Sequence, residues 1–262
     1  MRRFTILGCG SSGGVPRLGN KWGACDPENP KNRRRRCSLL IEQEGPGGMT
    51  TVLIDTTPDM REQLLDADVS RIDAVVYTHS HADHVHGIDD LRMIVFNMRA
   101  RLPVYADAPT EADLRKRFGY AFEQPEGSPY PPILDLHSLN GELVIDGPGG
   151  TVDIVPFAVE HGPITVQGIR CGDVAYLPDV SEIPETSWHH VEGLDTWIVD
   201  ALRLTPHPSH SHLDKTLEWI ARAAPRRAVI TNMHVDLDYA ATNEATPAHV
   251  TPAHDGLTIV RP

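Results

Sequence analysis

The chain has 262 residues, which is enough for one large domain or two small ones. Hydrophobic residues make up 40% of it, so it can bury a sizeable core. The formal net charge is −12 with neutral histidines, which argues against an extended grip on nucleic acid, because such a grip needs Lys and Arg along the phosphates. A small anionic substrate is compatible with this charge, since a metal site creates its own local positive field.

Cysteine usage and the amino-terminal segment indicate the compartment. The four cysteines form no CxxC pair, and a disulfide framework is not expected in a chain of this length. The apolar run Phe4–Leu7 after the first arginines spans about four residues, too short for the roughly 7–15 residues of a signal-peptide core. No stretch approaches the roughly 20 apolar residues of a membrane span. We therefore expect a cytoplasmic protein with no membrane partner.

The first half of the chain alternates short apolar runs with helical patterns. A strand is predicted at residues 3–7, followed by the small-residue loop Gly8–Gly14. The turn Gly45–Gly48 between two apolar runs is a hairpin signal. Pro58 suits the first turn of a helix. Further strands are predicted at residues 37–42, 51–54, 73–78 and 104–106, and helices at residues 58–67, 88–98 and 110–118.

The second half repeats this style. Strands are predicted at residues 143–145, 152–159, 164–170, 174–177, 197–199, 228–231 and 257–260, and an amphipathic helix at residues 213–223. Strand runs separated by helices in two similar halves predict an α/β fold in which two sheets pack together with helices outside.

The segment Thr78–Gly87 carries metal-ligand residue types at the end of an apolar strand. His79 and His81 lie two apart, so on an extended segment both side chains point the same way. Asp83 and His84 are adjacent and can reach a second ion from the start of the following helix. Imidazole together with carboxylate suits zinc, manganese or iron far better than calcium or magnesium. The segment therefore predicts a transition-metal site.

Three later residues stand just past apolar runs, where α/β architectures place their sites. His161 and Asp179 each close such a run, and His234 follows the run at residues 228–231. Each of them alone is more often an ordinary loop residue. In this order after the histidine cluster, they form a candidate ligand set.

The pattern His79-x-His81-x-Asp83-His84, followed by His161, Asp179 and His234, resembles the metallo-β-lactamase superfamily over nearly the whole chain. Asp55, which follows an early apolar run, matches the acidic residue that supports the site in that superfamily. The resemblance implies an αββα sandwich of two mixed β-sheets flanked by helices, with residues 1–262 as a single hydrolase domain.

The resemblance also implies two divalent metal ions and no organic cofactor. By similarity, one ion would be held by His79, His81 and His161, the other by Asp83, His84 and His234, with Asp179 bridging them. Such a pocket keeps a net positive charge of about one despite the acidic chain. A metal-bound water ionises near pH 7 and supplies a hydroxide nucleophile. Zinc and manganese fit the mixed nitrogen and oxygen ligands equally well.

Two further segments bear on the substrate. Gly8–Pro16 resembles the opening of the branch that holds the tRNA 3′-processing nucleases and the phosphoribosyl 1,2-cyclic phosphate phosphodiesterases (PhnP-like). The segment His207–Asp214 is placed like the extra catalytic histidine of those phosphodiesterases. His210 is the first candidate to protonate the leaving oxygen or bind a phosphate oxygen. His212 is the alternative, or a substrate contact, and Asp83 is a second catalytic candidate.

The leading hypothesis is a metal-dependent phosphodiesterase that cleaves a small cyclic or nucleotide-like phosphodiester by attack of a metal-bridging hydroxide. The alternatives are a lactonase or thioesterase, a tRNA 3′-processing nuclease, and a non-catalytic metal-dependent nucleotide-binding protein. The chain lacks the long Gly-rich or basic arm of the tRNA nucleases. The phosphodiesterases of that branch have a cysteine-rich early loop that holds a structural zinc; the matching region here offers only Cys25, with Cys37 later, so no structural zinc is expected there. A homodimer is a further expectation.

One basic run, Lys31–Arg36, has no assigned role. Two interpretations stay open: a solvated loop, or a position near an anionic substrate.

Overall fold

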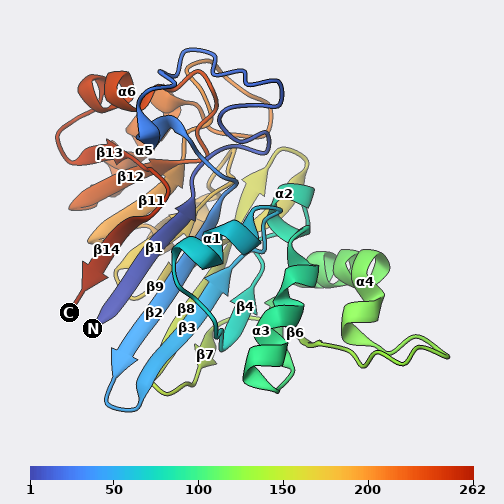
Figure 1. Ribbon diagram of the computed structural model, residues 1–262. Helices are drawn as coiled ribbons and strands as arrows, with labels where there is room; N and C mark the ends of the chain where they lie inside the picture. Colours follow the sequence, from blue (N-terminus) through green and yellow to red (C-terminus); the bar gives the residue numbers. More distant parts are fainter. The chain divides into compact units, whose positions relative to one another are not determined.

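The computed structural model describes all residues from 1 to 262. By its internal contacts the chain divides into two compact units. Unit 1 consists of Met1–Thr5, Ser38–Asp153 and Thr258–Pro262, and unit 2 consists of Ile6–Cys37 and Ile154–Leu257. The strands form two seven-stranded sheets, one mainly in each unit, and helices flank them (Figure 1). The predicted fold class, two mixed sheets with flanking helices, is confirmed.

The sheet of unit 1 has the strand order β14-β1-β2-β3-β4-β5-β6. Its strands are β14 (Leu257–Arg261), β1 (Arg2–Gly8), β2 (Ser38–Gly45), β3 (Gly48–Ile54), β4 (Ala74–Val76), β5 (Leu102–Ala106) and β6 (Leu134–Ser138). The helices of this unit are α1 (Met60–Asp66), α2 (Ala82–Val85), η2 (Ile88–Asp90), α3 (Leu91–Met98) and α4 (Ala108–Phe122).

β2 and β3 form the predicted hairpin, with Leu39 opposite Ile54 and Gly45 opposite Gly48. Gly48 has a φ of +129°, a conformation that only glycine adopts readily, so the tight turn depends on it. From β3 to β6 the neighbouring strands run parallel. Their carboxyl ends therefore meet at one edge of the sheet, which is where ligand-binding residues of such sheets gather.

The sheet of unit 2 has the strand order β13-β12-β11-β10-β9-β8-β7. Its strands are β13 (Val250–Pro252), β12 (Arg227–Thr231), β11 (Thr196–Asp200), β10 (Val174–Leu177), β9 (Ile164–Cys171), β8 (Val152–His161) and β7 (Leu143–Ile145). Its helices are η1 (Pro30–Asn32), η3 (Glu185–His190), α5 (Leu213–Ala223) and α6 (Tyr239–Ala245).

β10, β11, β12 and β13 are parallel, and β10 and β11 are buried along their whole length. Strands covered on both faces read as continuous apolar runs, which is why their positions follow from the sequence. β8 instead alternates buried and exposed residues over much of its length. It is antiparallel to β9, and β9 to β10, so β8 runs in the same direction as β10 and ends at the same edge.

Most predicted elements are present, with changed ends. The predicted helix at residues 88–98 is a 3-10 turn followed by α3, and α4 extends to Phe122. β6, α6 and β13 were not predicted. α6 is polar and lacks an apolar stripe, and its start depends on Asp238, whose carboxylate accepts a 2.9 Å hydrogen bond from Ala241 N.

The basic run Lys31–Arg36 is not a uniformly solvated loop. The guanidinium of Arg34 is buried and donates a 3.0 Å hydrogen bond to Asn32 Oδ1. Arg35 forms an ion pair with Asp255 at 3.0 Å. Arg33 is exposed. The solvated-loop interpretation is therefore wrong for Arg34 and Arg35, which have structural partners inside unit 2.

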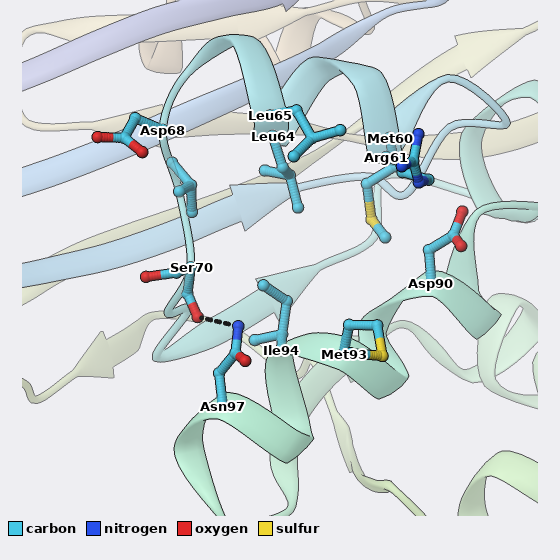
Figure 2. A pocket seen from close by; sticks show the side chains of 11 residues that line it. Met60, Arg61, Leu64, Leu65, Asp68, Ser70, Asp90, Met93, Ile94 and Asn97 are labelled. Atoms are coloured by element: carbon cyan, nitrogen blue, oxygen red, sulfur yellow. Dashed lines mark hydrogen bonds between the residues drawn. The ribbon is translucent and has the colours of Figure 1, made fainter.

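α1 and the η2–α3 segment line a surface pocket of about 390 Å³ in unit 1 (Figure 2). Met60, Leu64 and Ile94 line it, and Asn97 Nδ2 donates a 3.2 Å hydrogen bond to the Ser70 carbonyl at its edge. None of the predicted metal ligands is among its lining residues. No helix is both long and apolar enough to cross a membrane.

Candidate metal centre

The predicted ligands of unit 1 follow the carboxyl ends of two neighbouring strands. Asp55 directly follows β3, and the segment from His79 to His84 follows β4 and continues into α2. Because β3 and β4 are parallel and paired, these two segments lie side by side. The ligand atoms of His79 and His81 lie within 4.8 Å of each other, as expected for residues two apart on an extended segment.

Asp55 holds this segment in place through hydrogen bonds to Thr78 and His84. Its buried carboxylate accepts hydrogen bonds from Thr78 N and Thr78 Oγ1, both at 2.8 Å, and from His84 Nδ1 at 2.7 Å. Burial raises the pKa of Asp55, while the charge of His84 and the hydrogen bonds from Thr78 oppose this shift. Asp55 also has a φ of +63°, a strained conformation for a residue other than glycine. The structure thus gives Asp55 the supporting contacts that the resemblance implied.

The proton positions on two histidines follow from these contacts. Thr78 Oγ1 donates its only proton to Asp55, so at its 3.0 Å contact with His79 Nδ1 it accepts, and His79 carries its proton on Nδ1. His84 likewise donates from Nδ1 to Asp55. In this tautomer the lone pair of each imidazole is on Nε2, the nitrogen that could bind a metal ion. The Nε2 atom of His84 lies 3.5 Å from Asp83 Oδ2.

α4 holds the same segment from the other side. Ser80, between the two histidines, donates a 2.6 Å hydrogen bond to Asp113 Oδ2. Arg117, one turn further along α4, donates to the Ser80 carbonyl at 2.6 Å and to Asp113 at 3.0 Å. These contacts fix the backbone that carries His79 and His81.

In unit 2, His161 ends β8 and Asp179 follows β10. Both side chains are buried, and His161 Nε2 lies 3.5 Å from Asp179 Oδ2. His161 Nδ1 donates a 2.5 Å hydrogen bond to the Ser209 carbonyl, so Nε2 is the nitrogen that could bind a metal ion. Asn232 Nδ2 donates to Asp179 Oδ1 at 3.1 Å and fixes that carboxylate.

Gly162 allows the segment 208–210 to approach His161. A side chain at this position would place its Cβ 2.8 Å from Ser209 Cβ, and Gly162 has a φ of +59°. The approach brings His210 beside His161, with ring centroids 4.5 Å apart. Only glycine combines a positive φ with the lack of a Cβ. Gly162 is therefore needed for the close approach of residues 208–210 to His161.

His210 is oriented by Asp200, the last residue of β11. Its Nδ1 donates a 2.9 Å hydrogen bond to Asp200 Oδ2, which also accepts from Val180 N at 3.1 Å. Burial raises the pKa of Asp200 to about 7, although the charge of His210 opposes this shift. His212, by contrast, is the N-cap residue of α5 and makes no side-chain capping bond. The two histidines therefore differ: the ring of His210 is oriented by a carboxylate, whereas His212 occupies the first position of a helix.

His234 lies beyond β12, and its ring nitrogens face two different groups. Nδ1 is 3.1 Å from Asp236 Oδ1, and Nε2 contacts the guanidinium of Arg17. Burial lowers the pKa of His234; Arg17 and Arg203 lower it further, while Asp236 opposes the shift. A neutral imidazole is the form that binds a metal ion.

The donor chemistry of these residues fits transition-metal ions. Histidines that bind metals usually donate their second ring nitrogen to a carboxylate or a backbone carbonyl, and His84 and His161 do so. The buried Asp179 is fixed by an amide in the same way.

Three contributing residues were missed by the sequence interpretation: Asp200, Asn232 and Arg17. Asp200 ends an apolar strand, which is the same signal that identified Asp179, so it could have been found. Asn232 lies between the end of β12 and His234, but no sequence pattern marks an asparagine at this position as part of a site. Arg17 lies far from His234 in sequence, and no local pattern connects them.

A family model described as "Beta-lactamase superfamily domain" matches residues 50–233, more than two thirds of the chain. The chain belongs to the β-lactamase superfamily. Superfamily members with the metallo-β-lactamase fold are hydrolases that use divalent metal ions. The predicted resemblance is confirmed, and the clusters described above could serve as metal ligands.

Solved structures extend the comparison. A diphosphatase from the PhnP family is 37% identical, with a TM-score of 0.89 over 100% of this chain and 98% of that chain. Zn²⁺-bound PqqB from Methylobacterium extorquens is 18% identical, with a TM-score of 0.75 over 99% and 100%. The short form of human tRNase Z is 17% identical, with a TM-score of 0.67 over 99% of each chain. At these identities the last two structures show a shared metallo-β-lactamase fold and nothing further.

Among curated proteins, an octanoyltransferase from Porphyromonas gingivalis (strain ATCC BAA-308 / W83) is 31% identical over 263 residues. The match covers 98% of this chain and 51% of that protein. The chain therefore spans about half the length of this relative.

Proposed function

We propose that this chain is a dinuclear metal-dependent phosphodiesterase acting on a small cyclic or nucleotide-like phosphodiester. The 37% identity with a PhnP-family diphosphatase over the whole chain supports phosphorus rather than carbonyl chemistry. The net charge of −12 agrees with a small substrate held locally rather than a long polyanion held along the surface.

We propose the same ligand sets that the superfamily resemblance implies. His79, His81 and His161 would hold one ion, Asp83, His84 and His234 the other, and Asp179 would bridge them. Zinc and manganese are the proposed metals. Bound there, such ions would lower the pKa of a coordinated water and stabilise charge on phosphoryl oxygens. Asp83 is the proposed second catalytic group because it carries a carboxylate next to His84.

The observation that carries the proposal is the pair of Asp200 and His210 beside the ligand His161. Asp200 accepts from Nδ1 at 2.9 Å and so directs Nε2 of His210 away from the strand end. His161 and His210 are in ring contact, so the imidazole of His210 lies beside a ligand of the proposed metal site. An imidazole in this place can give a proton to the departing alkoxide, which is the step that limits esters with poor leaving groups. His212 remains the proposed substrate contact.

An acyl-ester or thioester hydrolase is the second candidate. It is favoured by the octanoyltransferase relative, whose name describes transfer of an acyl group. A carbonyl hydrolase passes through a tetrahedral intermediate and depends less on a proton donor for an activated leaving group.

The test is a hydrolysis screen with purified protein of measured metal content. The substrates are bis-p-nitrophenyl phosphate, a 2′,3′-cyclic nucleotide, phosphoribosyl 1,2-cyclic phosphate, a lactone, an acyl thioester and a precursor tRNA. We expect metal-dependent cleavage of a small phosphodiester and no cleavage of the carbonyl compounds. Cleavage of the thioester or lactone alone would reject the proposal in favour of the second candidate.

A cytoplasmic location and association into a homodimer also stay predictions. Cell fractionation and sedimentation velocity test them, respectively.

A further inference from the structure

α3 is apolar on its outer side as well as on the side that packs into unit 1. Ile94 and Val95 are buried, whereas Met93 is 60% exposed and Phe96 is 58% exposed. Six of its eight residues are apolar. A helix that is apolar on all sides is normally covered on all sides, because contact of its outer side with water costs free energy. The single chain leaves this side of α3 without a cover.

Neighbouring elements extend the outer side of α3 into an apolar face. Five of the eleven large hydrophobic side chains that are exposed form this α3 face: Leu65, Met93, Phe96, Tyr120 and Tyr130. Leu65 from α1 and Met93 from α3 line the pocket between these two helices (Figure 2). Phe96, Tyr120 and Tyr130 line a second surface pocket of about 410 Å³. α3 is therefore a ridge between two hollows, and a contiguous apolar surface of this kind marks an interaction site.

Leu18 shows the contrast with an isolated apolar residue. It is 96% exposed at the tip of a closed turn, in which Arg17 N donates to Lys21 O at 3.0 Å and Lys21 N donates to Arg17 O at 3.1 Å. It lines neither of the two pockets. Single exposed apolar residues are normal on protein surfaces, so the exposure of Leu18 does not indicate a partner.

The two ends of α3 carry opposite charges. Asp90 is the N-cap residue and makes no side-chain capping bond, and Arg99 is the C-cap residue. Both residues are exposed. In an antiparallel pair of α3 helices, each acidic end would meet the basic end of the other copy, and the two helix dipoles would oppose each other as well. Met93 lies three residues after Asp90, and Phe96 lies three residues before Arg99. The register that pairs Asp90 with Arg99 therefore also places Met93 opposite Phe96.

We propose that the α3 face binds a second copy of this chain and forms the centre of a two-fold homodimer. Such an interface uses the same patch on both copies, so the patch has to be complementary to itself. The α3 face meets this condition twice, since it carries acid and base at opposite ends and a projecting ring beside a hollow. Phe96 of each copy enters the pocket between α1 and α3 of the other copy and packs there against Met93 and Leu65. Contacts between a thioether and an aromatic ring are favourable.

A second copy explains the α3 face better than a small ligand or an unrelated protein does. A small molecule in the pocket between α1 and α3 would cover Leu65 and Met93 but would leave Phe96, Tyr120 and Tyr130 in water. An unrelated protein could cover all five residues, but it gives no reason for opposite charges at equal distances from the middle of α3. The second copy accounts for both observations.

The first experiment measures the association of the purified chain by sedimentation velocity over a range of concentrations. Phe96→Asp places a charge in the middle of the α3 face, and Leu18→Asp makes the same kind of change at an exposed residue outside it. We expect roughly 30-fold weaker dimerisation for F96D and no change for L18D, because a buried aromatic residue near the centre of an interface contributes most to binding. Circular dichroism spectra of both variants control for the fold.

The second experiment tests the antiparallel register and leaves Phe96 in place. Asp90→Arg gives α3 a basic side chain at both ends, and Arg99→Asp gives it an acidic side chain at both ends. Each variant alone should dimerise roughly tenfold more weakly than the parent, since like charges then face each other. An equimolar mixture of D90R and R99D should form mixed dimers as tightly as the parent, because every end of α3 then faces an opposite charge.

Three outcomes would overturn the inference. The parent chain could stay monomeric up to about 100 µM, in which case the α3 face has a different partner. Equal dimerisation of F96D and L18D would place the interface elsewhere on the molecule. A mixture of D90R and R99D that associates no better than each variant alone would reject the antiparallel packing of α3. None of these measurements needs turnover or a metal ion, so their result does not depend on the proposed phosphodiesterase function.

Discussion

Nδ1 of His84 donates a 2.7 Å hydrogen bond to Oδ2 of Asp55, a carboxylate with no exposed surface. The same carboxylate holds Thr78, which in turn holds His79. One residue therefore orients two of the proposed metal ligands without being a ligand itself.

The first prediction concerns this carboxylate. Asp55→Asn keeps the shape but removes the charge that His84 Nδ1 faces, so the imidazole should lose its fixed orientation. We expect metal affinity to fall roughly 10–100-fold, as for other groups that support metal-bound histidines. Competition with a chromogenic chelator measures it. Glu62→Gln, an exposed carboxylate paired with Arg61, is the control. Equal metal affinity in D55N and E62Q would contradict the supporting role.

A second prediction separates the two late histidines. His210→Ala removes the imidazole that Asp200 orients, and it should lower kcat for a phosphodiester with an unactivated leaving group by roughly 10²–10⁴-fold. His212→Ala should change kcat by less than about tenfold, because His212 starts α5 and makes no capping bond. Steady-state kinetics on a 2′,3′-cyclic nucleotide checks both. The assignment is wrong if H212A is the more impaired variant.

Metal removal should lower stability as well as activity. Ions that bind only the folded protein stabilise it by RT ln(1 + [M]/Kd), about 4 kcal/mol when the free metal is 1,000-fold above Kd. We expect the Tm to fall on treatment with a chelator and to recover with zinc or manganese. Differential scanning calorimetry measures this. His161→Ala should remove most of the metal response, and an undiminished response in that variant would exclude His161 as a ligand.

Stability should also depend on pH through His190, whose ring stacks on Phe157 with centroids 4.8 Å apart. Burial lowers the pKa of His190, and the charges of His189 and Arg170 lower it further. Below about pH 6.5 the unfolded chain takes up a proton that the folded protein resists, so stability falls as the pH drops. His190→Gln should lose less stability than the parent between pH 7 and pH 5 in urea unfolding. If the unfolding free energies of the variant and the parent depend on pH in the same way, His190 does not contribute to the pH dependence of stability.

The basic run offers a matched pair of variants. Arg34→Ala removes a buried guanidinium that bonds Asn32 and contacts Cys25 Sγ at 3.9 Å. It should cost roughly 2–4 kcal/mol of unfolding free energy, whereas Arg33→Ala, which is exposed, should stay within about 0.5 kcal/mol. Urea denaturation of both gives the comparison. If both variants lose a similarly small amount of unfolding free energy, the buried guanidinium of Arg34 does not stabilise the fold.

Local chemistry explains which parts of this molecule could be predicted. β10 and the central residues of β11 are apolar because both faces of these strands are buried, and α5 has a clear apolar stripe, so their positions follow from the sequence. The histidine cluster could be predicted because its four candidate ligands fall within six consecutive positions. β6 and α6 were missed because their residues are mostly polar, and their formation depends on packing against neighbours such as α4 and β13.

Contacts between distant segments could not be predicted in the same way. Arg34 was assigned to a run of charges because its burial depends on residues from other parts of unit 2 that close over it. Arg17 and His234 are 217 positions apart, and Asp200 and His210 face each other only because the chain returns after β11. Candidate metal ligands can be recognised by residue type and spacing in the sequence. The residues that orient them can be recognised only from the three-dimensional structure.

The closed turn between Arg17 and Lys21 has a consequence for protein engineering. Residues 18–20 lie between its two reciprocal backbone bonds, and Leu18 at its tip is almost fully solvent-exposed. Libraries that vary the length and composition of this tip should therefore yield folded proteins at high frequency. Selectivity toward new esters could then be evolved there, with the strands and their histidines kept constant.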